Sequence, residues 1–330
     1  MPNEYCVAVI GTGSIGLRHC KVLTQIAEVR PIAVSRRPER VHELKASGYM
    51  AVQSLDDAAR LGARVCIIAT DTGRHVEDGV RAVERGLHVL VEKPLSTDAE
   101  KARLLCAKAE AANRKIFVGC PLRFSKSLNR FREMLNDIGQ LHYARIECQS
   151  YLPYWRPTRN YLESYSARMD EGGVLRDLIH EIDYAGWLFG WPVALQARVE
   201  NLGRLGIAAD ETADLIWKTA DGCLISVRLD YLSKPERRKL AAYGQWGILE
   251  WDGVLNTVTL RREGESMREI LLPQTKDEIL LAQSEAFIAV ARGGDALSLA
   301  TGLDGVRALA VCDAARRASE SRCEKKVEYQ

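Results

Sequence analysis

Three glycines at a fixed spacing, Gly11, Gly13 and Gly16, follow the first apolar run of this 330-residue sequence and open a predicted helix. Gly11 permits a tight turn, Gly13 lets the backbone approach a ligand, and Gly16 lets the helix pack closely on the strand. With Ser14 and Ile15 they would hold the pyrophosphate of a dinucleotide at the positive end of the helix. A glycine turn without a ligand is the alternative, which the strand–turn–helix setting disfavours.

The end of the second predicted strand indicates which nicotinamide dinucleotide is bound. NAD-specific sites place a carboxylate there for the ribose 2′-hydroxyl. This sequence has Ser35, Arg36 and Arg37 instead. A hydroxyl and two guanidinium groups suit the 2′-phosphate of NADP, because arginine binds phosphate through paired hydrogen bonds. NADP is therefore the favoured cofactor and NAD the alternative. The site could also accept both cofactors. The plainer interpretation is that Arg36 and Arg37 only form a solvated turn.

Lys93 is the first candidate for proton chemistry. It follows a short apolar run within Val91-Glu92-Lys93-Pro94, and ligands of open α/β sheets bind beyond the carboxyl ends of strands. Partial desolvation by a bound cofactor suits a lysine for proton transfer. Taken alone, a solvated loop lysine is the plainer interpretation.

Alternating strands and helices must position these residues. Short apolar runs over 5–10, 31–35, 50–53, 64–69, 87–91 and 115–119 alternate with amphipathic segments, which predicts an open, doubly wound parallel sheet in residues 1–120. Residues 121–330 read as an α+β domain with a mostly antiparallel open sheet. Its predicted helices cover about 124–136, 173–189, 276–292 and 301–320, and the C-terminal helix is free to pack back on the first domain.

Composition excludes several classes of function. Lys and Arg total 46 against 44 Asp and Glu, a balance that gives no support for nucleic-acid binding. No apolar run approaches the length of a membrane span, and no leader pattern precedes the first strand. The nine cysteines are scattered and never spaced as CxxC, and the histidine spacing suggests no metal. We therefore expect a cytoplasmic protein without a metal, a membrane partner or a nucleic-acid partner.

Four motifs in register give a more specific result. Residues 11–19 (GTGSIGLRH), 92–94 (EKP), 119–124 (GCPLRF) and 172–180 (GGVLRDLIH) together resemble the glucose–fructose oxidoreductase / inositol 2-dehydrogenase (Gfo/Idh/MocA) family over essentially the whole chain. The resemblance implies a Rossmann domain followed by an α/β domain whose open sheet often forms an oligomer interface. A homodimer or homotetramer through that sheet is the expectation.

The resemblance also implies roles for individual residues. Lys93 would hydrogen-bond the substrate hydroxyl or carbonyl, His180 would donate or accept a proton, and Asp177 would orient either His180 or the substrate. The family's Asp commonly precedes its His by four residues and here the gap is three, so Asp183, one turn after His180, is an alternative support. Further cofactor contacts are implied at Thr70, Thr72, His75, Glu92, Lys93, Pro94 and Arg123. At the third motif only Arg123 and Phe124 match the family.

The loop over residues 151–168 leads into the catalytic segment and is rich in aromatic and arginine side chains. Aromatic rings can stack on a sugar, and arginines can bind a carboxylate or phosphate. The predicted substrate contacts are Arg123, Trp155, Arg156, Tyr165, Arg168, Asp177 and His180. An anionic sugar derivative is the sharper hypothesis, and a packed loop with solvated arginines is the plainer one.

The sequence therefore favours an NAD(P)-dependent oxidoreductase that interconverts a secondary alcohol and a ketone on a sugar, sugar acid, nucleotide sugar or cyclitol. Two alternatives use the same fold. One is a glycosidase that holds NAD and produces no net redox change. The other is a regulator that senses the dinucleotide and catalyses nothing, against which the presence of both Lys93 and His180 argues.

Overall fold

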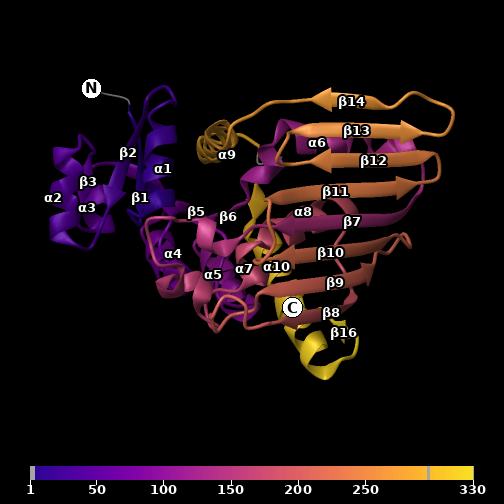
Figure 1. The fold of residues 1–330 in the computed structure, drawn as a ribbon. Helices are drawn as coiled ribbons and strands as arrows, with labels where there is room; N and C mark the ends of the chain where they lie inside the picture. The colour runs from indigo at the N-terminus through magenta and orange to yellow at the C-terminus, as the bar shows by residue number, and fades with distance from the viewer. Residues whose placement is uncertain (1–3, 296–297, 330) are drawn as a thin grey trace. The chain divides into compact units, whose positions relative to one another are not determined.

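Two units make up this computed structural model, which describes residues 4–295 and 298–329 (Figure 1). The first unit contains Met1–Phe124 and Thr275–Val306, and the second contains Ser125–Gln274 and Arg307–Gln330. The first unit is thus assembled from two stretches of chain that are far apart in sequence.

The first unit is built on a seven-stranded sheet with the order β15-β6-β5-β4-β1-β2-β3. Its pairs are parallel except for β15 with β6. Central strands are buried on both faces, as Val7, Ala8 and Val9 of β1 show with no exposed surface. The Rossmann-type parallel sheet is confirmed. Its strands are β1 (Tyr5–Ile10), β2 (Val29–Val34), β3 (Ala51–Val52), β4 (Ala63–Ile68), β5 (His88–Glu92), β6 (Ile116–Gly119) and β15 (Ala300–Thr301).

Helices cover both faces of this sheet because the chain moves in opposite directions from β1 and from β4, and crossovers between parallel strands are right-handed in nearly all proteins. Helix α1 packs against α9 on one face, and α4 packs against α5 on the other. Gly79 permits the second contact, since a Cβ there would lie 2.9 Å from Leu105. The helices are α1 (Ser14–Leu23), α2 (Pro38–Ala46), α3 (Leu55–Arg60), α4 (His75–Glu84), α5 (Ala99–Ala111) and α9 (Lys276–Ala291), with the short turns η1 (Thr72–Arg74) and η2 (Pro121–Phe124).

The glycine turn lies where the strand order reverses, between β1 and β4. Gly11 has a φ of +98°, and a Cβ on it would lie 2.4 Å from the carbonyl oxygen of Ala69. A Cβ on Gly16 would lie 1.9 Å from the carbonyl oxygen of Gly11. Both glycines are therefore required by backbone contacts. Gly13 differs, because its Cβ direction meets no atom within 4 Å.

The second unit is built on a nine-stranded sheet with the order β14-β13-β12-β11-β7-β10-β9-β8-β16. It is mostly antiparallel, as predicted, with a parallel pair between β7 and β10. Strands β14, β15 and β16, of four, two and two residues, have no counterpart among the predicted strands. The strands are β7 (Leu141–Gln149), β8 (Ala194–Glu200), β9 (Thr212–Lys218), β10 (Leu224–Asp230), β11 (Arg237–Gly244), β12 (Gly247–Asp252), β13 (Thr257–Arg262), β14 (Arg268–Leu271) and β16 (Lys325–Lys326).

Helices of the second unit pack on one face of this sheet, behind the strands in Figure 1. They are α6 (Lys126–Met134), α7 (Val174–Asp177), α8 (Ile179–Phe189) and the part of α10 (Gly302–Ser321) that follows Val306, with η3 (Leu135–Ile138), η4 (Leu152–Tyr154), η5 (Tyr161–Glu163) and η6 (Tyr165–Ala167). A single helix over 173–189 was the expectation, and this is wrong in one respect. Leu178, with φ −96° and ψ 29°, interrupts it and separates α7 from α8.

Two absences hold for the described residues. None of their helices is both long and apolar enough to cross a membrane. No three of their His, Cys, Asp or Glu side chains gather into a group that could hold a metal ion.

The two kinds of glycine in the turn lead to a test of stability. Gly16→Ala should lower the free energy of unfolding by about 1–3 kcal/mol, because its Cβ meets a backbone oxygen that cannot move aside. Gly13→Ala, into open space with φ −75°, should cost less than Gly16→Ala. Thermal melting of both variants measures the difference, and equal melting temperatures would contradict the close contact.

Candidate active site

The N-terminus of α1 fits the pyrophosphate of a dinucleotide. Gly13 is the N-cap residue, no side chain caps the helix, and its first turn contains no acidic residue. The first N–H groups of a helix have no partner within the helix, so an uncapped N-terminus beside open space offers donors to an anion. The space that a side chain at Gly13 would fill is empty, which leaves room for a ligand against the backbone.

Beyond β2, Ser35 is buried while Arg36 and Arg37 are exposed. Arg36 donates to Asp78 at 3.1 Å and lies 3.6 Å from Glu77. Asp78 is almost fully buried, and it also accepts hydrogen bonds from Thr70 and Arg74. The one buried carboxylate identified beside Arg36 is thus already bonded to two arginines and a hydroxyl.

The segment after β4 turns inward. Thr72 and His75 are buried, and Thr70 is half-buried. The two ring nitrogens of His75 lie 2.8 Å from the carbonyl oxygen of Pro94 and 2.9 Å from that of Thr70. Burial lowers the pKa of His75 below its ordinary value, although both carbonyl contacts act in the opposite direction. His75 therefore ties the end of β4 to the turn after β5.

The turn after β5 contains Lys93, whose side chain is half-buried. Glu92 points into the protein, where Oε1 lies 2.8 Å from Nε2 of His19 on α1. Its other oxygen accepts the Lys93 backbone N–H at 3.3 Å. Burial raises the pKa of Glu92, but the hydrogen bond from His19 and the nearby charges of His19, Lys93 and His75 outweigh burial and hold that pKa below its ordinary value.

Arg123, on η2, is buried in the first unit and forms an ion pair with Asp304 at 3.3 Å. Asp304 also accepts the backbone N–H and hydroxyl of Thr301. This ion pair joins η2 to the start of α10. The contact of Arg123 with cofactor and substrate stays a prediction.

In the second unit, Asp177 ends α7 and is buried against two tyrosines. Tyr231 donates its hydroxyl to Oδ2 of Asp177 at 2.5 Å. The charge of Asp177, followed by burial, raises the pKa of Tyr165, while burial, followed by that charge, raises the pKa of Tyr231. Both phenols therefore remain protonated and able to donate to Asp177.

His180 is the second residue of α8 and is half-buried. Asp183, one turn further along the same helix, is buried. The break at Leu178 places Asp177 and His180 on different helices, so their side chains are not related by the spacing of one continuous helix.

The loop over 151–168 holds its aromatic residues by specific contacts. Trp155 donates to Ser150 at 2.8 Å and meets the ring of Tyr231 edge to face at 5.4 Å. Arg156 is exposed, and its positive charge opposes the rise in the pKa of Tyr165. Arg168, also exposed, is paired with Glu171 at 2.9 Å.

Arg176 has a structural role. It is buried on α7, and its guanidinium donates to the carbonyl oxygens of Met169 and Asp170 at 3.0 and 2.8 Å. It thereby holds the loop that leads into α7.

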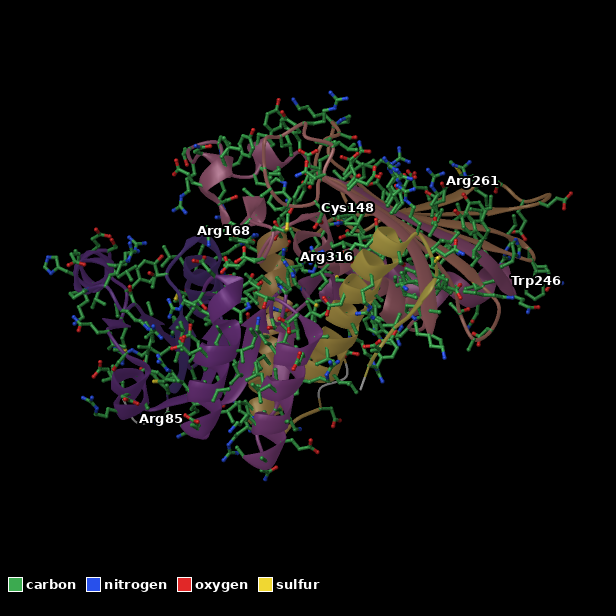
Figure 2. The ribbon with its side chains drawn as sticks, turned by 90° about the horizontal axis from the view of Figure 1, so that it is seen from below. Arg85, Cys148, Arg168, Trp246, Arg261 and Arg316 are labelled. Atoms are coloured by element: carbon green, nitrogen blue, oxygen red, sulfur yellow. The ribbon has the colours of Figure 1, made fainter. Side chains whose placement is uncertain are left out.

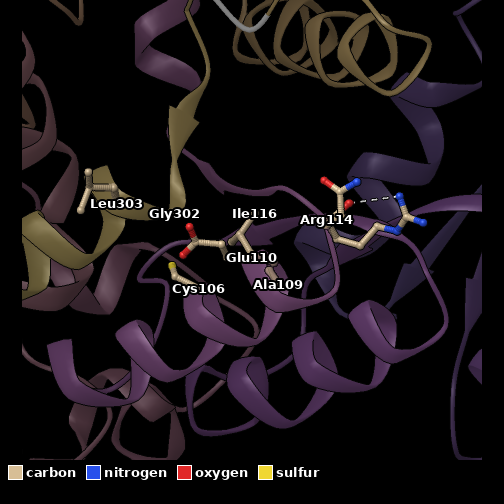
Figure 3. Close-up of a pocket in the computed structure, with 8 residues that line it drawn as sticks. Cys106, Ala109, Glu110, Arg114, Ile116, Gly302 and Leu303 are labelled. Atoms are coloured by element: carbon tan, nitrogen blue, oxygen red, sulfur yellow. Dashed lines mark hydrogen bonds between the residues drawn. The ribbon is translucent and has the colours of Figure 1, made fainter.

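A surface hollow of about 270 Å³ lies in the first unit between α5, β6 and the start of α10 (Figure 3). Cys106, Glu110, Ile116 and Gly302 line it. Ile116 opens β6, so the hollow lies at the amino ends of the parallel strands. Ligands of open α/β sheets bind at the other edge. This hollow is therefore separate from the glycine turn.

Several residues around these sites were not predicted from the sequence. They are Asp78 and Arg74, which organise Arg36; Arg40, which donates to the carbonyl oxygen of Thr12; Tyr231, which bonds Asp177; and the role of His19. The position of His19 at the end of the first motif, residues 11–19, is a sequence signal for one of them.

Two family models match the chain. The model described as "Oxidoreductase family, NAD-binding Rossmann fold" covers residues 6–120, and that for the GFO/IDH/MocA C-terminal domain covers residues 129–250. Together they include the glycine turn, the Lys93 turn, Asp177 and His180. A curated relative, inositol 2-dehydrogenase of Rhizobium meliloti (strain 1021), is 28% identical over 225 residues. That match spans 65% of this chain and 65% of the relative, just under two thirds of its length.

Solved structures share the fold over nearly the whole chain. Levoglucosan dehydrogenase in complex with NADH gives a TM-score of 0.87 at 18% identity, covering 98% of this chain and 99% of that one. The WlbA dehydrogenase from Bordetella pertussis, in complex with NADH and UDP-GlcNAcA, gives 0.84 at 18% identity, with 99% of both chains covered. With both family models matched in order, the chain belongs to the Gfo/Idh/MocA family.

Proposed function

We propose that the protein is an NAD(P)-dependent oxidoreductase that interconverts a secondary alcohol and a ketone on a sugar, sugar acid, nucleotide sugar or cyclitol. The observation that carries the proposal lies within the first unit. An uncapped helix N-terminus beside open space at Gly13 and the half-buried Lys93 both follow the carboxyl ends of strands in one parallel sheet. A dinucleotide site and a proton-transfer group at the same sheet edge suit hydride chemistry on an alcohol.

The residues of the chain handle the proton. A bound nicotinamide supplies the acceptor or donor of hydride. In the oxidative direction the substrate hydroxyl loses its proton to a base, and in the reductive direction the carbonyl oxygen gains one from an acid. We assign this proton to Lys93 and His180, in keeping with the family motifs that contain them.

Asp177 has a supporting role in this proposal. A buried carboxylate that accepts a hydrogen bond from the Tyr231 hydroxyl, with Tyr165 close by, is held in one orientation by its neighbours. Such a fixed negative charge can orient a substrate hydroxyl or stabilise a protonated imidazole. Removal of the Tyr231 hydroxyl would remove one of the contacts that fix the orientation of the Asp177 carboxylate.

The substrate class follows from the loop over 151–168. Trp155 and Tyr165 offer ring surfaces, and the exposed guanidinium of Arg156 in the same loop offers paired donors to an anion. Arg168 already bonds Glu171, so it contributes less positive charge. We therefore favour an anionic sugar derivative, a class that includes the UDP-GlcNAcA named for the Bordetella structure.

NADP is the preferred cofactor in this proposal. The end of β2 carries Ser35, Arg36 and Arg37 and no carboxylate. Asp78 is bonded to Arg36, Arg74 and Thr70, which partly neutralises its charge. Arg40 adds a further guanidinium beside Thr12 of the glycine turn. A 2′-phosphate would meet several positive charges there.

We further propose a homo-oligomer formed through the second sheet. One face of this sheet is covered by α6, α7 and α8. The other carries Ile216, Leu224 and the paired rings of Tyr143 and Tyr243, whose centroids are 5.4 Å apart. Cross-strand ion pairs such as Arg228 with Asp214 neutralise charge on the same face. A broad face with apolar side chains and paired charges suits a second copy of the chain.

We place the protein in the cytoplasm. Most of its nine cysteines are buried thiols, and burial raises the pKa of several, including Cys20 to about 12. Small buried thiols of this kind are usual in a reducing compartment.

Lys93→Met should reduce kcat by about 10²- to 10⁴-fold, the usual contribution of a positioned acid or base. The affinity for NADH should change much less. Turnover is followed by reduced-nicotinamide absorbance with a panel of sugars, sugar acids and cyclitols. Lys45→Met, at an exposed position on α2, is the control. Intact turnover in Lys93→Met would contradict the proposed role.

Arg36→Ala combined with Arg37→Ala should raise the KM for NADP by about 10- to 100-fold, because charge-assisted hydrogen bonds contribute about 1.5–3 kcal/mol. The KM for NAD should change by less than about threefold. Arg85→Ala is the control, since Arg85 lies on the surface of the first unit, where it donates to Asp56 (Figure 2). Equal effects on both cofactors would argue against a 2′-phosphate site.

Leu224→Glu should shift the protein toward the 36.8 kDa monomer, because it places a charge on the proposed interface. Leu224 is 39% exposed, and the control Leu61→Glu changes a residue of the first unit that is 46% exposed. Sedimentation equilibrium measures the mass of each variant. A monomeric wild-type protein, or an oligomer unaffected by Leu224→Glu, would exclude this face.

A further inference from the structure

The turn that carries Lys93 is held from beneath by a buried pair of side chains. Nε2 of His19 lies 2.8 Å from Oε1 of Glu92, with side-chain exposures of 0% and 11%. The two residues are 73 positions apart and belong to different elements, α1 and the last position of β5. The pair therefore joins the helix that follows the glycine turn to the residue immediately before Lys93.

The second oxygen of Glu92 reaches Lys93 itself. It accepts the backbone N–H of Lys93 at 3.3 Å, so one carboxylate bonds both His19 and the main chain of the lysine. Space around the carboxylate is restricted as well. A Cβ on Gly119, the last residue of the neighbouring strand β6, would lie 2.9 Å from Oε1 of Glu92. Glycine at position 119 therefore leaves room for the carboxylate in this orientation.

The same turn is held from the other face of the sheet by His75. Its Nδ1 lies 2.8 Å from the carbonyl oxygen of Pro94, the residue after Lys93. Helices α1 and α4 lie on opposite faces because β1 and β4 lead the chain in opposite directions. Lys93 thus stands between two neighbours that are each tied to a buried histidine.

A buried carboxylate with these contacts costs free energy if it loses one partner, because the remaining charge is left without compensation. A carboxylate placed only for cofactor contact would face the open side of the sheet edge. Glu92 instead faces His19, although both belong to motifs that the sequence associates with the cofactor. This orientation is what indicates a role in positioning.

We propose that His19 and Glu92 are positioning residues that hold the Lys93 turn in the orientation needed for proton transfer. The inference rests on the proposed function of Lys93. It assigns to His19 a role through Glu92 and not through the cofactor. It also implies that the glycine helix and the catalytic turn move as one piece.

Hydrogen exchange of the protein without cofactor tests directly whether the His19–Glu92 pair holds the Lys93 turn in place. His19→Leu removes the donor to Glu92 and should speed exchange of the amides over residues 92–95 by at least about fivefold. His19→Gln keeps an N–H donor and should restore much of the protection. His42→Leu, at an exposed position on α2, is the matched control and should leave exchange unchanged. Unchanged exchange in His19→Leu would overturn the proposal.

Steady-state kinetics of the holoenzyme give the second measurement. His19→Leu and Glu92→Gln should each lower kcat about tenfold or more, while NADH affinity, measured by fluorescence, changes less than about threefold. The double variant should lose no more kcat than the worse single variant, because both substitutions break the same His19–Glu92 hydrogen bond. Equal losses in kcat and NADH affinity would overturn the proposal, since they would mean that the pair only supports the glycine turn.

Two controls distinguish a failure of the positioning role of His19 and Glu92 from a failure of the proposed function of Lys93. If His19→Leu melts well below the wild type, His19→Gln and Glu92→Gln are used for the test instead. Wild-type hydrogen exchange and kcat in Glu92→Gln would then overturn the proposed positioning role. Lys93→Met in the same assays tests the proposed function by itself. Intact turnover in Lys93→Met refutes the proposed role of Lys93. An inactive Lys93→Met variant together with a fully active His19→Leu variant refutes only the positioning role of His19 and Glu92.

Discussion

The first unit depends on a close approach of backbone to backbone at the point where its strand order reverses. The carbonyl oxygen of Gly11 occupies the place that a side chain on Gly16 would need, and Gly11 itself lies against Ala69 at the end of β4. This contact brings the N-terminus of α1 to the carboxyl edge of the sheet. The helix can then present unbonded N–H groups to an anion and place His19 beneath β5. The proposed dinucleotide binding and the proposed positioning of Lys93 thus both depend on the same few glycines.

The second unit meets a different constraint, which is the burial of polar groups. Asp177 and Arg176 are adjacent, buried and held by different partners, a tyrosine hydroxyl for one and loop carbonyls for the other. Because the helix is interrupted at Leu178, α8 begins at Ile179 and His180 lies in its first turn. Buried polar groups need hydrogen-bond partners, and the bonds from Arg176 to the carbonyl oxygens of Met169 and Asp170 hold the segment that leads into α7.

Much of the fold could be predicted from the sequence because it follows from local patterns. Runs such as Val65–Ile68 are apolar at every position and become strands buried on both faces. The glycine spacing is equally local, and the four motifs were sufficient to recognise the family. Contacts between distant segments are less accessible. Asp78 reaches Arg36 across 42 positions, and residues 275–306 return to the first unit, and neither leaves a periodic signal in the sequence. The helix break at Leu178 is also invisible, since leucine favours helices.

Transfer of deuterium is the most direct measurement of the central claim. A sugar or cyclitol labelled with deuterium at the carbon bearing the reactive hydroxyl is incubated with the protein and oxidised cofactor, and the recovered dinucleotide is examined by mass spectrometry. The proposed oxidoreductase predicts reduced cofactor that carries one deuterium, together with a ketone product. Hydrolysis of a glycoside without net reduced cofactor, or a bound dinucleotide that never gains the label with any substrate of the panel, would contradict it.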